Sequence, residues 1–137
     1  MVFAGIAAGC GAVGRVTSGD PAKGEALFKM MTLPGGKPGC ASCHTLAAAG
    51  THGTIGPNLD AAFAADKSKA FVSSGTIQTI RDDVRGQIAY ADSNPGTGST
   101  GMPANLLTGQ DAKDVAVFVA QCAAVPHCKV GSTPSSG

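Results

Sequence analysis

The first stretch with apolar residues at helical spacing follows Asp20-Pro21, a pair that suits the N-cap and the first position of a helix. The residues that recur on one face of this stretch are Gly24, Leu27, Phe28 and Met31. The run Pro34-Gly35-Gly36 cannot continue a helix, so we expect the helix to end just before it.

Two further helices are expected in the second half of the chain. Over residues 76–85, the positions that fall on one side are Ile77, Ile80, Arg81 and Val84. The last helix should begin at Thr108, because Asp111 three residues later completes a capping-box pattern. Its buried face is expected at Val115, Phe118, Val119 and Cys122. A shorter helix is expected over residues 67–74.

No segment alternates apolar and polar residues convincingly, so no strand is predicted. Residues 47–60 and 92–101 have the composition of loops, and the tail from Lys129 is rich in Gly, Ser and Pro and is expected to be disordered. The predicted fold class is therefore all-α, with about three to five helices and long loops. Loops this long are uncommon in a small domain, and they make sense if they wrap a bound group.

The composition is that of one small domain with little apolar bulk. The 137 residues include five Phe, one Tyr and no Trp, which makes a thin core for a chain of this size. A buried apolar cofactor would supply the missing volume. The formal net charge is +1 and no basic run or basic-aromatic patch is present, which argues against nucleic acid as a partner.

Cysteine is frequent for so short a chain. The five positions are Cys10, Cys40, Cys43, Cys122 and Cys128. This usage is typical of an extracytoplasmic protein rather than a cytosolic one. Cys122 and Cys128 flank the end of the last apolar segment with Pro126 between them, so we expect a disulfide that fastens the tail to the last helix.

The N-terminal residues resemble part of an export signal. Residues 1–14 are apolar and small, but they are too short to span a bilayer and lack a basic n-region. The sequence AAGC at 7–10 resembles a bacterial lipoprotein cleavage site, although Ala7 stands where that pattern prefers Leu. We therefore expect residues 1–19 to be a truncated signal followed by a flexible tether. Cys10 is then either lipidated, as a membrane anchor, or removed with the signal.

The motif Cys-Ala-Ser-Cys-His at 40–44 carries the clearest chemistry. Two thiols three positions apart can reach the two vinyl groups on one edge of a haem, and the following His then lies under the iron. This spacing is the attachment pattern of c-type haem. Two alternatives stay open: a thioredoxin-like dithiol, which would follow a strand, and a zinc site. The other zinc ligands would be Cys122, His127 and Cys128.

The order and separation of the motifs resemble class I cytochrome c in its small bacterial monohaem form. The matching segments are GEALF, CASCHTLAAAGTHGTIGPNLD and GMPANLLTGQDAKDVAVFVA. The resemblance covers about residues 20–122 and implies a cytochrome c domain over 20–128, followed by a tail at 129–137. In that family a Gly and an aromatic four residues later pack against an aromatic of the last helix; here these residues are Gly24, Phe28 and Phe118.

The resemblance also implies the residues of the haem site. Cys40 and Cys43 would attach one haem c, and His44 and Met102 would be the axial ligands of its iron. The carbonyl of Pro57, in the GPNL segment, would accept a hydrogen bond from the second ring nitrogen of His44.

Other methionines and histidines are also candidates for iron ligands or for the core. Met102 lies in a Gly/Pro-rich loop, which suits a ligand better than a core residue, whereas Met30 and Met31 suit core positions on the first helix. His52 and His127 are the rival ligands for the iron, and a surface position is expected for His52.

The resemblance implies an electron carrier and not an enzyme. One haem would cycle between ferric and ferrous in a periplasmic or membrane-associated respiratory chain, as a monomer that meets donor and acceptor redox proteins. Haem attachment of this type takes place outside the cytoplasmic membrane, so we expect the protein in the periplasm or on the outer face of the cytoplasmic membrane, with or without a lipid anchor. The alternatives are a haem-bearing subunit or module of an oxidoreductase complex and a haem protein with a labile sixth ligand that binds small molecules.

Overall fold

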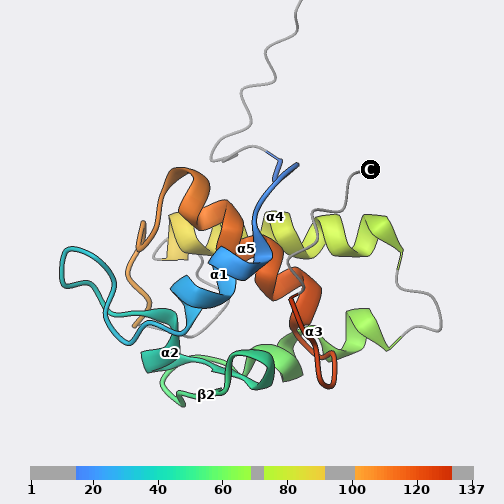
Figure 1. Cartoon of the computed structure of the whole chain (residues 1–137), viewed down its shortest axis with the longest axis horizontal. Helices are drawn as coiled ribbons and strands as arrows, with labels where there is room; N and C mark the ends of the chain where they lie inside the picture. Colours follow the sequence, from blue (N-terminus) through green and yellow to red (C-terminus); the bar gives the residue numbers. More distant parts are fainter. Residues whose placement is uncertain (1–14, 69–72, 92–100, 131–137) are drawn as a thin grey trace, which may run out of the picture.

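The computed structural model describes residues 15–68, 73–91 and 101–130, which form a mainly helical fold. Its helices are α1 (Pro21–Phe28), α2 (Cys40–Cys43), α3 (Leu59–Lys67), α4 (Ser74–Tyr90) and α5 (Gly109–Cys122). A 3-10 turn, η1 (Ala47–Ala49), joins two short strands, β1 (Thr45–Leu46) and β2 (Thr51–His52). Figure 1 shows α5 at the centre, crossed by α1 and backed by α4, with α2 and β2 at the opposite side from the N-terminal segment. The predicted helical fold class is confirmed.

Helix α1 begins as predicted but ends earlier. The Asp20 side chain accepts hydrogen bonds from the amides of Ala22 and Lys23, at 2.9 and 3.2 Å, and so caps the helix. The last helical residue is Phe28. Beyond it the chain turns so that Leu33 is buried, and Met31, predicted as a core residue of this helix, is 62% exposed. That prediction is wrong for Met31, because burial of Leu33 requires the helix to stop.

The crossing of α1 and α5 contains the packing that the resemblance implied. A Cβ atom on Gly24 would lie 2.0 Å from the carbonyl oxygen of Asp114, so only glycine permits this approach. One turn later the rings of Phe28 and Phe118 meet edge to face, with centroids 5.9 Å apart. The glycine lets the backbones come together, and the two rings fill the space beside them.

The middle helices differ from the prediction. The helix expected over 67–74 lies largely outside the described residues; of its two ends, Lys67 is the last residue of α3 and Ser74 is the first of α4. Helix α3 starts inside a segment predicted as loop and is capped by Asn58, whose side chain accepts from the Ala61 amide at 3.2 Å. Its sequence is rich in Ala, which favours helix but gives a weak periodic pattern. Helix α4 extends beyond the predicted 76–85 at both ends.

The predicted buried face of α5 is confirmed. Its four members, Val115, Phe118, Val119 and Cys122, are all buried. The predicted capping box at Thr108 is not formed, because the Thr108 side chain makes no capping hydrogen bond. At the other end Cys122 and Cys128 are joined by a disulfide with Cα atoms 5.3 Å apart. Val130 packs against the core, so the folded part of the chain extends beyond the boundary predicted just before Lys129.

The N-terminal boundary also lies earlier than expected. Val16 is fully buried, and its amide donates to Asp82 Oδ1 at 2.8 Å while its carbonyl accepts from Gln78 Nε2 at 2.8 Å. The predicted flexible tether is therefore wrong over residues 15–19, because these bonds fasten that segment to α4. Cys10, the predicted anchor, lies outside the described residues, as does most of the loop predicted over 92–101.

A two-stranded antiparallel sheet was not predicted. Thr45 pairs with His52 and Leu46 with Thr51, across η1 and Gly50, which has a positive φ of 66°. Two-residue strands are too short to show alternation in the sequence. The segment predicted as loop over 47–60 thus contains a hairpin that directly follows the Cys-Ala-Ser-Cys-His motif.

Candidate haem site

One apolar cavity of about 290 Å³ lies between α2, α3, α4, α5 and the segment at Gly101. A single water needs only roughly 10–15 Å³ of such space, so this cavity is shaped for a large group. Its wall is formed by Phe28, Cys40, Cys43, His44, Ile55, Gly56, Pro57, Leu59, Ala62, Phe63, Asp83, Val84, Gln87, Ile88, Gly101, Met102, Val115 and Val119. All five residues predicted for the haem site are among them.

Helix α2 is a single turn that places Cys40 and Cys43 on the same side, where both line the cavity. Burial raises the pKa of the Cys40 thiol to about 11, with a smaller contribution from nearby Cys43. Cys40 is therefore a neutral thiol at neutral pH. Such a thiol does not suit a reactive dithiol, because the thiolate is the nucleophile.

His44 ends this turn, and its ring is held from two directions. Its Nδ1 lies 2.8 Å from the carbonyl oxygen of Pro57, so the hydrogen bond expected from the resemblance is present in the structure. A Cβ atom on Gly56 would lie 2.5 Å from the ring carbon Cε1. Because Nδ1 donates to Pro57, the lone pair on Nε2 is free to bind a metal.

Met102 reaches the same cavity from a segment far along the chain. It is half-buried, packs against the main core cluster and is flanked by exposed Gly101. Met30, which was predicted as a core residue, also packs against that cluster but does not line the cavity. The loop just before Met102 lies outside the described residues.

The cavity wall contributed by α3 and α4 was not predicted from the sequence. The side chains that form it are Leu59, Phe63, Val84 and Ile88. Two polar residues, Asp83 and Gln87, stand in the same wall. Partial burial raises the pKa of the Asp83 carboxyl, and the nearby charges of Asp82 and Asp66 add to this shift. The GPNL motif pointed to Pro57, but no periodic signal marked α3.

The geometry weakens the alternatives to haem. Cys122 and Cys128 are joined to each other, so their sulfur atoms are not offered to a zinc ion with Cys40. Among the residues that the structure describes, no three His, Cys, Asp or Glu side chains come together as a metal site. His52 and His127 are exposed and neither is part of the cavity wall. No strand of the kind found in a thioredoxin-like site precedes α2 in the described chain.

Comparison with known proteins agrees with this geometry. A model of the family described as cytochrome c matches residues 21–123. The chain belongs to the cytochrome c family. No curated protein matches this cytochrome significantly. Its structure is similar to the crystal structure of the c-type cytochrome SorU from Sinorhizobium meliloti, with 28% identity and a TM-score of 0.52 over 77% of this chain and 92% of that one.

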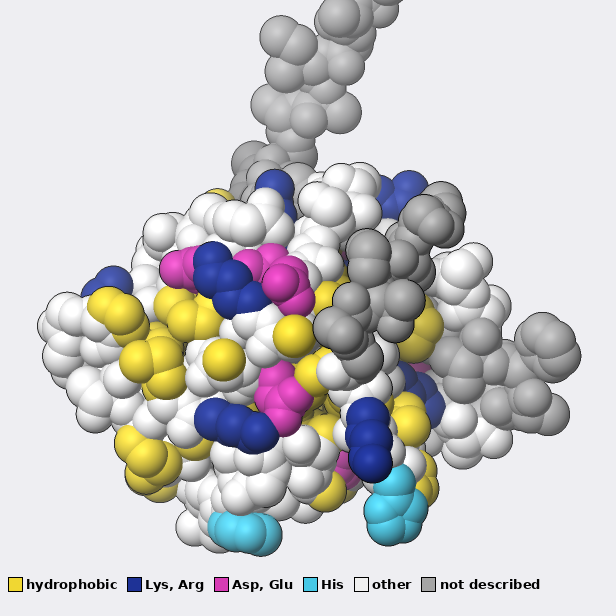
Figure 2. Space-filling view, viewed as in Figure 1, with side chains coloured by type: hydrophobic (Ala, Val, Ile, Leu, Met, Phe, Trp, Pro, Cys, Tyr) yellow, Lys and Arg dark blue, Asp and Glu magenta, His cyan; other side chains and the backbone are white. Residues whose placement is uncertain are grey.

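The family establishes the cofactor and the general activity of this cytochrome. It carries covalently bound haem c, and its function is electron transfer through that haem. The cavity fits such a group, because its wall is almost wholly apolar and carries two thiols, an imidazole and a thioether. On the face drawn in Figure 2, basic and acidic side chains are interspersed and neither sign forms a patch of its own. Within the described part of the chain, no helix is both long and apolar enough to cross a bilayer.

Proposed function

We propose that this cytochrome is a one-electron carrier in which Cys40 and Cys43 attach the haem and His44 and Met102 bind its iron. The haem supplies a ferric/ferrous couple. The observation that supports this assignment is that all four side chains line one apolar cavity, although Met102 comes from a distant part of the chain. Two protein ligands would leave no position for a substrate, which favours a carrier over an enzyme.

Each residue has a distinct role in this proposal. The thiols of Cys40 and Cys43 would attach the cofactor in the cavity that residues of α4 and α5 also line. The Pro57 carbonyl orients the His44 ring and increases its basicity by accepting a hydrogen bond from Nδ1–H. The neutral thioether of Met102 favours the ferrous state and so raises the reduction potential. The apolar wall excludes water from both ligands.

The first test is an optical spectrum of the exported protein, oxidised and reduced with dithionite. Sharp reduced α and β bands and a weak far-red sulfur-to-iron band in the oxidised protein are expected. Haem bands without the far-red feature would contradict ligation by Met102. A colourless protein from a host with c-type maturation machinery would contradict the whole assignment.

Substitution of the sixth ligand sharpens this test. Met102→Ala should abolish the far-red band and lower the reduction potential by on the order of 0.1 V, because axial ligands set haem potentials over a wide range. Met31→Ala is the matched control, since Met31 is largely exposed and does not line the cavity. An unchanged potential in Met102→Ala would contradict the assignment.

Carbon monoxide separates the carrier from a protein with a labile sixth ligand. The reduced wild-type protein should not bind carbon monoxide at neutral pH, whereas Met102→Ala should bind it rapidly. Rapid binding by the wild-type protein would favour the small-molecule alternative. Co-purification with one dedicated enzyme at fixed stoichiometry would instead favour the haem-bearing subunit of an oxidoreductase complex.

We also propose that the protein works outside the cytoplasmic membrane, in a respiratory chain, as a monomer that meets donor and acceptor redox proteins. The disulfide between Cys122 and Cys128 supports an oxidising compartment. Alkylation of the unfolded protein without reductant should leave both residues unmodified, and two added groups at these positions would contradict the bridge.

An anchor at Cys10 would hold the protein close to the membrane. Val16 is buried, so the chain from Cys10 to the body spans at most about 22 Å when fully extended. Mass spectrometry of the mature N-terminus tests this: a diacylglyceryl group on Cys10 supports the anchor, and a start beyond Cys10 contradicts it.

A further inference from the structure

The hairpin that follows the Cys-Ala-Ser-Cys-His motif is built around the hydroxyl of Thr51. This residue is only 7% exposed. Its Oγ1 donates a hydrogen bond to the His44 carbonyl at 2.9 Å and accepts one from the Leu46 amide at 3.0 Å. A hydroxyl has a single proton, so the direction of both bonds is determined. One side chain therefore satisfies the polar groups on both sides of residue 45.

The same segment holds the backbone around His44 at further points. The Gly53 amide donates to the His44 carbonyl at 3.3 Å, and the Gly56 amide donates to the Cys43 carbonyl at 2.7 Å. A Cβ atom on Gly53 would lie 2.6 Å from the amide nitrogen of His44, so the backbone next to β2 lies against that of His44 too closely for a side chain. Residues 51–57 thus contact His44 through its peptide groups and, at Pro57, through its ring.

We propose that Thr51 is a positioning residue for the ligation of iron by His44. Its hydroxyl holds the peptide from which the imidazole projects, and this keeps Nδ1 aligned with the Pro57 carbonyl. A histidine ligand that donates its second N–H is better oriented and more basic, which stabilises the ferric state. The inference rests on the proposed ligation by His44.

Removal of the hydroxyl should therefore change the redox equilibrium as well as the stability. Thr51→Val keeps the shape of the side chain but removes the hydroxyl that accepts from the Leu46 amide and donates to the His44 carbonyl, which keeps the longer bond from Gly53. The Nδ1 bond to Pro57 should weaken. We expect the ferrous state to be favoured about threefold, which raises the potential by about 28 mV at 59 mV per tenfold.

The experiment compares three variants as exported holoproteins. Reduction potentials are measured by optical titration, and the Nδ1–H resonance of His44 in the ferrous protein is followed by NMR. Thr51→Ser retains the hydroxyl and should keep the wild-type potential and resonance. Thr54→Val changes an exposed threonine of the same segment and should also leave both unchanged. Only Thr51→Val should shift the two together.

The outcomes distinguish a positioning role of Thr51 from a purely structural one. A Thr51→Val protein that is less stable but has the wild-type potential and resonance would overturn the proposal, because Thr51 would then only support the fold. If that variant does not mature, hydrogen exchange in the wild-type protein decides. The Leu46 amide and the His44 Nδ1–H should exchange through one shared opening, with exchange rates that agree within about threefold. An exchange rate about 100-fold faster at Leu46 would overturn the link. A failure of the proposed function itself is distinguishable from these results, because it would show as missing haem bands or a missing far-red band in the spectrum of the wild-type protein.

Discussion

The α1–α5 crossing and the segment from Gly39 to Pro57 both form walls of the cavity, but different interactions hold them. At the crossing, backbones and apolar rings are in direct contact, as at Gly24 and at the Phe28–Phe118 pair. The segment has few large buried side chains. Its order comes from hydrogen bonds to the backbone, such as those of Thr51 and the bond between His44 and Pro57.

Because of this difference, substitutions at the crossing and in the segment should affect different properties, namely the stability of the fold and the orientation of the ligand His44. A close-packed crossing cannot absorb added volume, so changes there should act on the free energy of unfolding. A segment held by polar groups can yield locally, so changes there should act on the orientation of His44 at a smaller cost in stability. Two glycines, two carboxylates and their controls test this separation.

The largest effect is expected at Gly24. In Gly24→Ala the new methyl group would meet the Asp114 carbonyl oxygen at 2.0 Å and Phe118 Cβ at 2.8 Å. Because backbone is the obstacle, the helices must separate, and we expect a loss of about 3 kcal/mol or more in the free energy of unfolding. Denaturant titration of the holoprotein measures it. Gly86→Ala in α4, with no atom within 4 Å, should instead be neutral or stabilising; similar losses in both would refute the argument.

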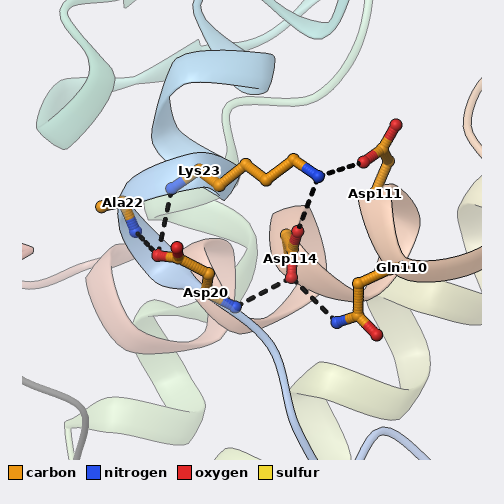
Figure 3. A network of polar contacts seen from close by, with 6 residues as sticks. All are labelled: Asp20, Ala22, Lys23, Gln110, Asp111 and Asp114. Carbon is orange, nitrogen blue, oxygen red and sulfur yellow. Dashed lines mark hydrogen bonds and ion pairs between the residues drawn. The ribbon is translucent and has the colours of Figure 1, made fainter.

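Asp114 tests the one buried charge at the crossing. Its Oδ1 accepts from the Asp20 amide at 2.8 Å and from Gln110 Nε2 at 3.0 Å, and Lys23 Nζ lies 3.6 Å from its Oδ2 (Figure 3). Asp114 is buried, whereas its partners are exposed and can turn to water. Asp114→Ala removes the shared acceptor of these bonds and should cost about 2 kcal/mol.

Asp111 provides the control for Asp114. It pairs with Lys23 at 2.7 Å but is half exposed, so Asp111→Ala should cost below about 1 kcal/mol. Equal losses in urea titrations of the two variants would mean that Asp114 acts only through Lys23.

Gly56 is the counterpart of Gly24 in the hydrogen-bonded segment. In Gly56→Ala the methyl group would meet the His44 ring at 2.5 Å, and this side chain can tilt away. Stability should fall by about 1 kcal/mol. The bond to Pro57 should lengthen, and the reduction potential should rise by about 30 mV as the ligand becomes less basic. Spectroelectrochemistry measures the shift, with Gly86→Ala as the unchanged control, and a loss of stability comparable to that of Gly24→Ala would break the comparison.

The smallest effect is expected at Asp83 in the cavity wall. Its pKa is raised above the usual value, chiefly by partial burial and further by Asp82 and Asp66, so the folded protein binds this proton more tightly than the unfolded chain. Stability should therefore fall as the pH rises from about 4 through the raised pKa. Asp83→Asn should stabilise the protein by at most about 0.5 kcal/mol at pH 7, because the group is largely exposed.

The pH dependence is the check for Asp83. The gain from Asp83→Asn should disappear below about pH 4, where the wild-type carboxyl is also neutral. Thermal unfolding scans at pH 4 and pH 7 measure this. A gain that is equal at both values would show that charge is not its cause.

Short-range features were predicted well because their physical causes lie within a few residues. Asp20-Pro21 starts a helix through its own capping bonds, and the spacing of Cys40, Cys43 and His44 is set by one helical turn. The buried face of α5 was also readable, because its apolar residues from Val115 to Cys122 repeat at helical spacing over about two turns. The ends of elements were not, as the early end of α1 and the longer extent of α4 show.

What depended on distant partners was missed. Val16 looked like part of a tether because nothing nearby marks its contacts with Gln78 and Asp82 in α4. The β1–β2 hairpin depends on where the Thr51 hydroxyl lies, and α3 depends on the cavity that its Leu59 and Phe63 complete.

The sequence by itself determined the chemistry of the site, since thiols, imidazole, carbonyl and thioether are present in recognisable local motifs. The tertiary structure decided that these groups share one cavity, and that Thr51 and Gly56 lie against His44. The reason is physical: attachment spacing is a property of a short peptide. Burial, close approach and the direction of a hydrogen bond exist only after segments far apart in the chain have packed together.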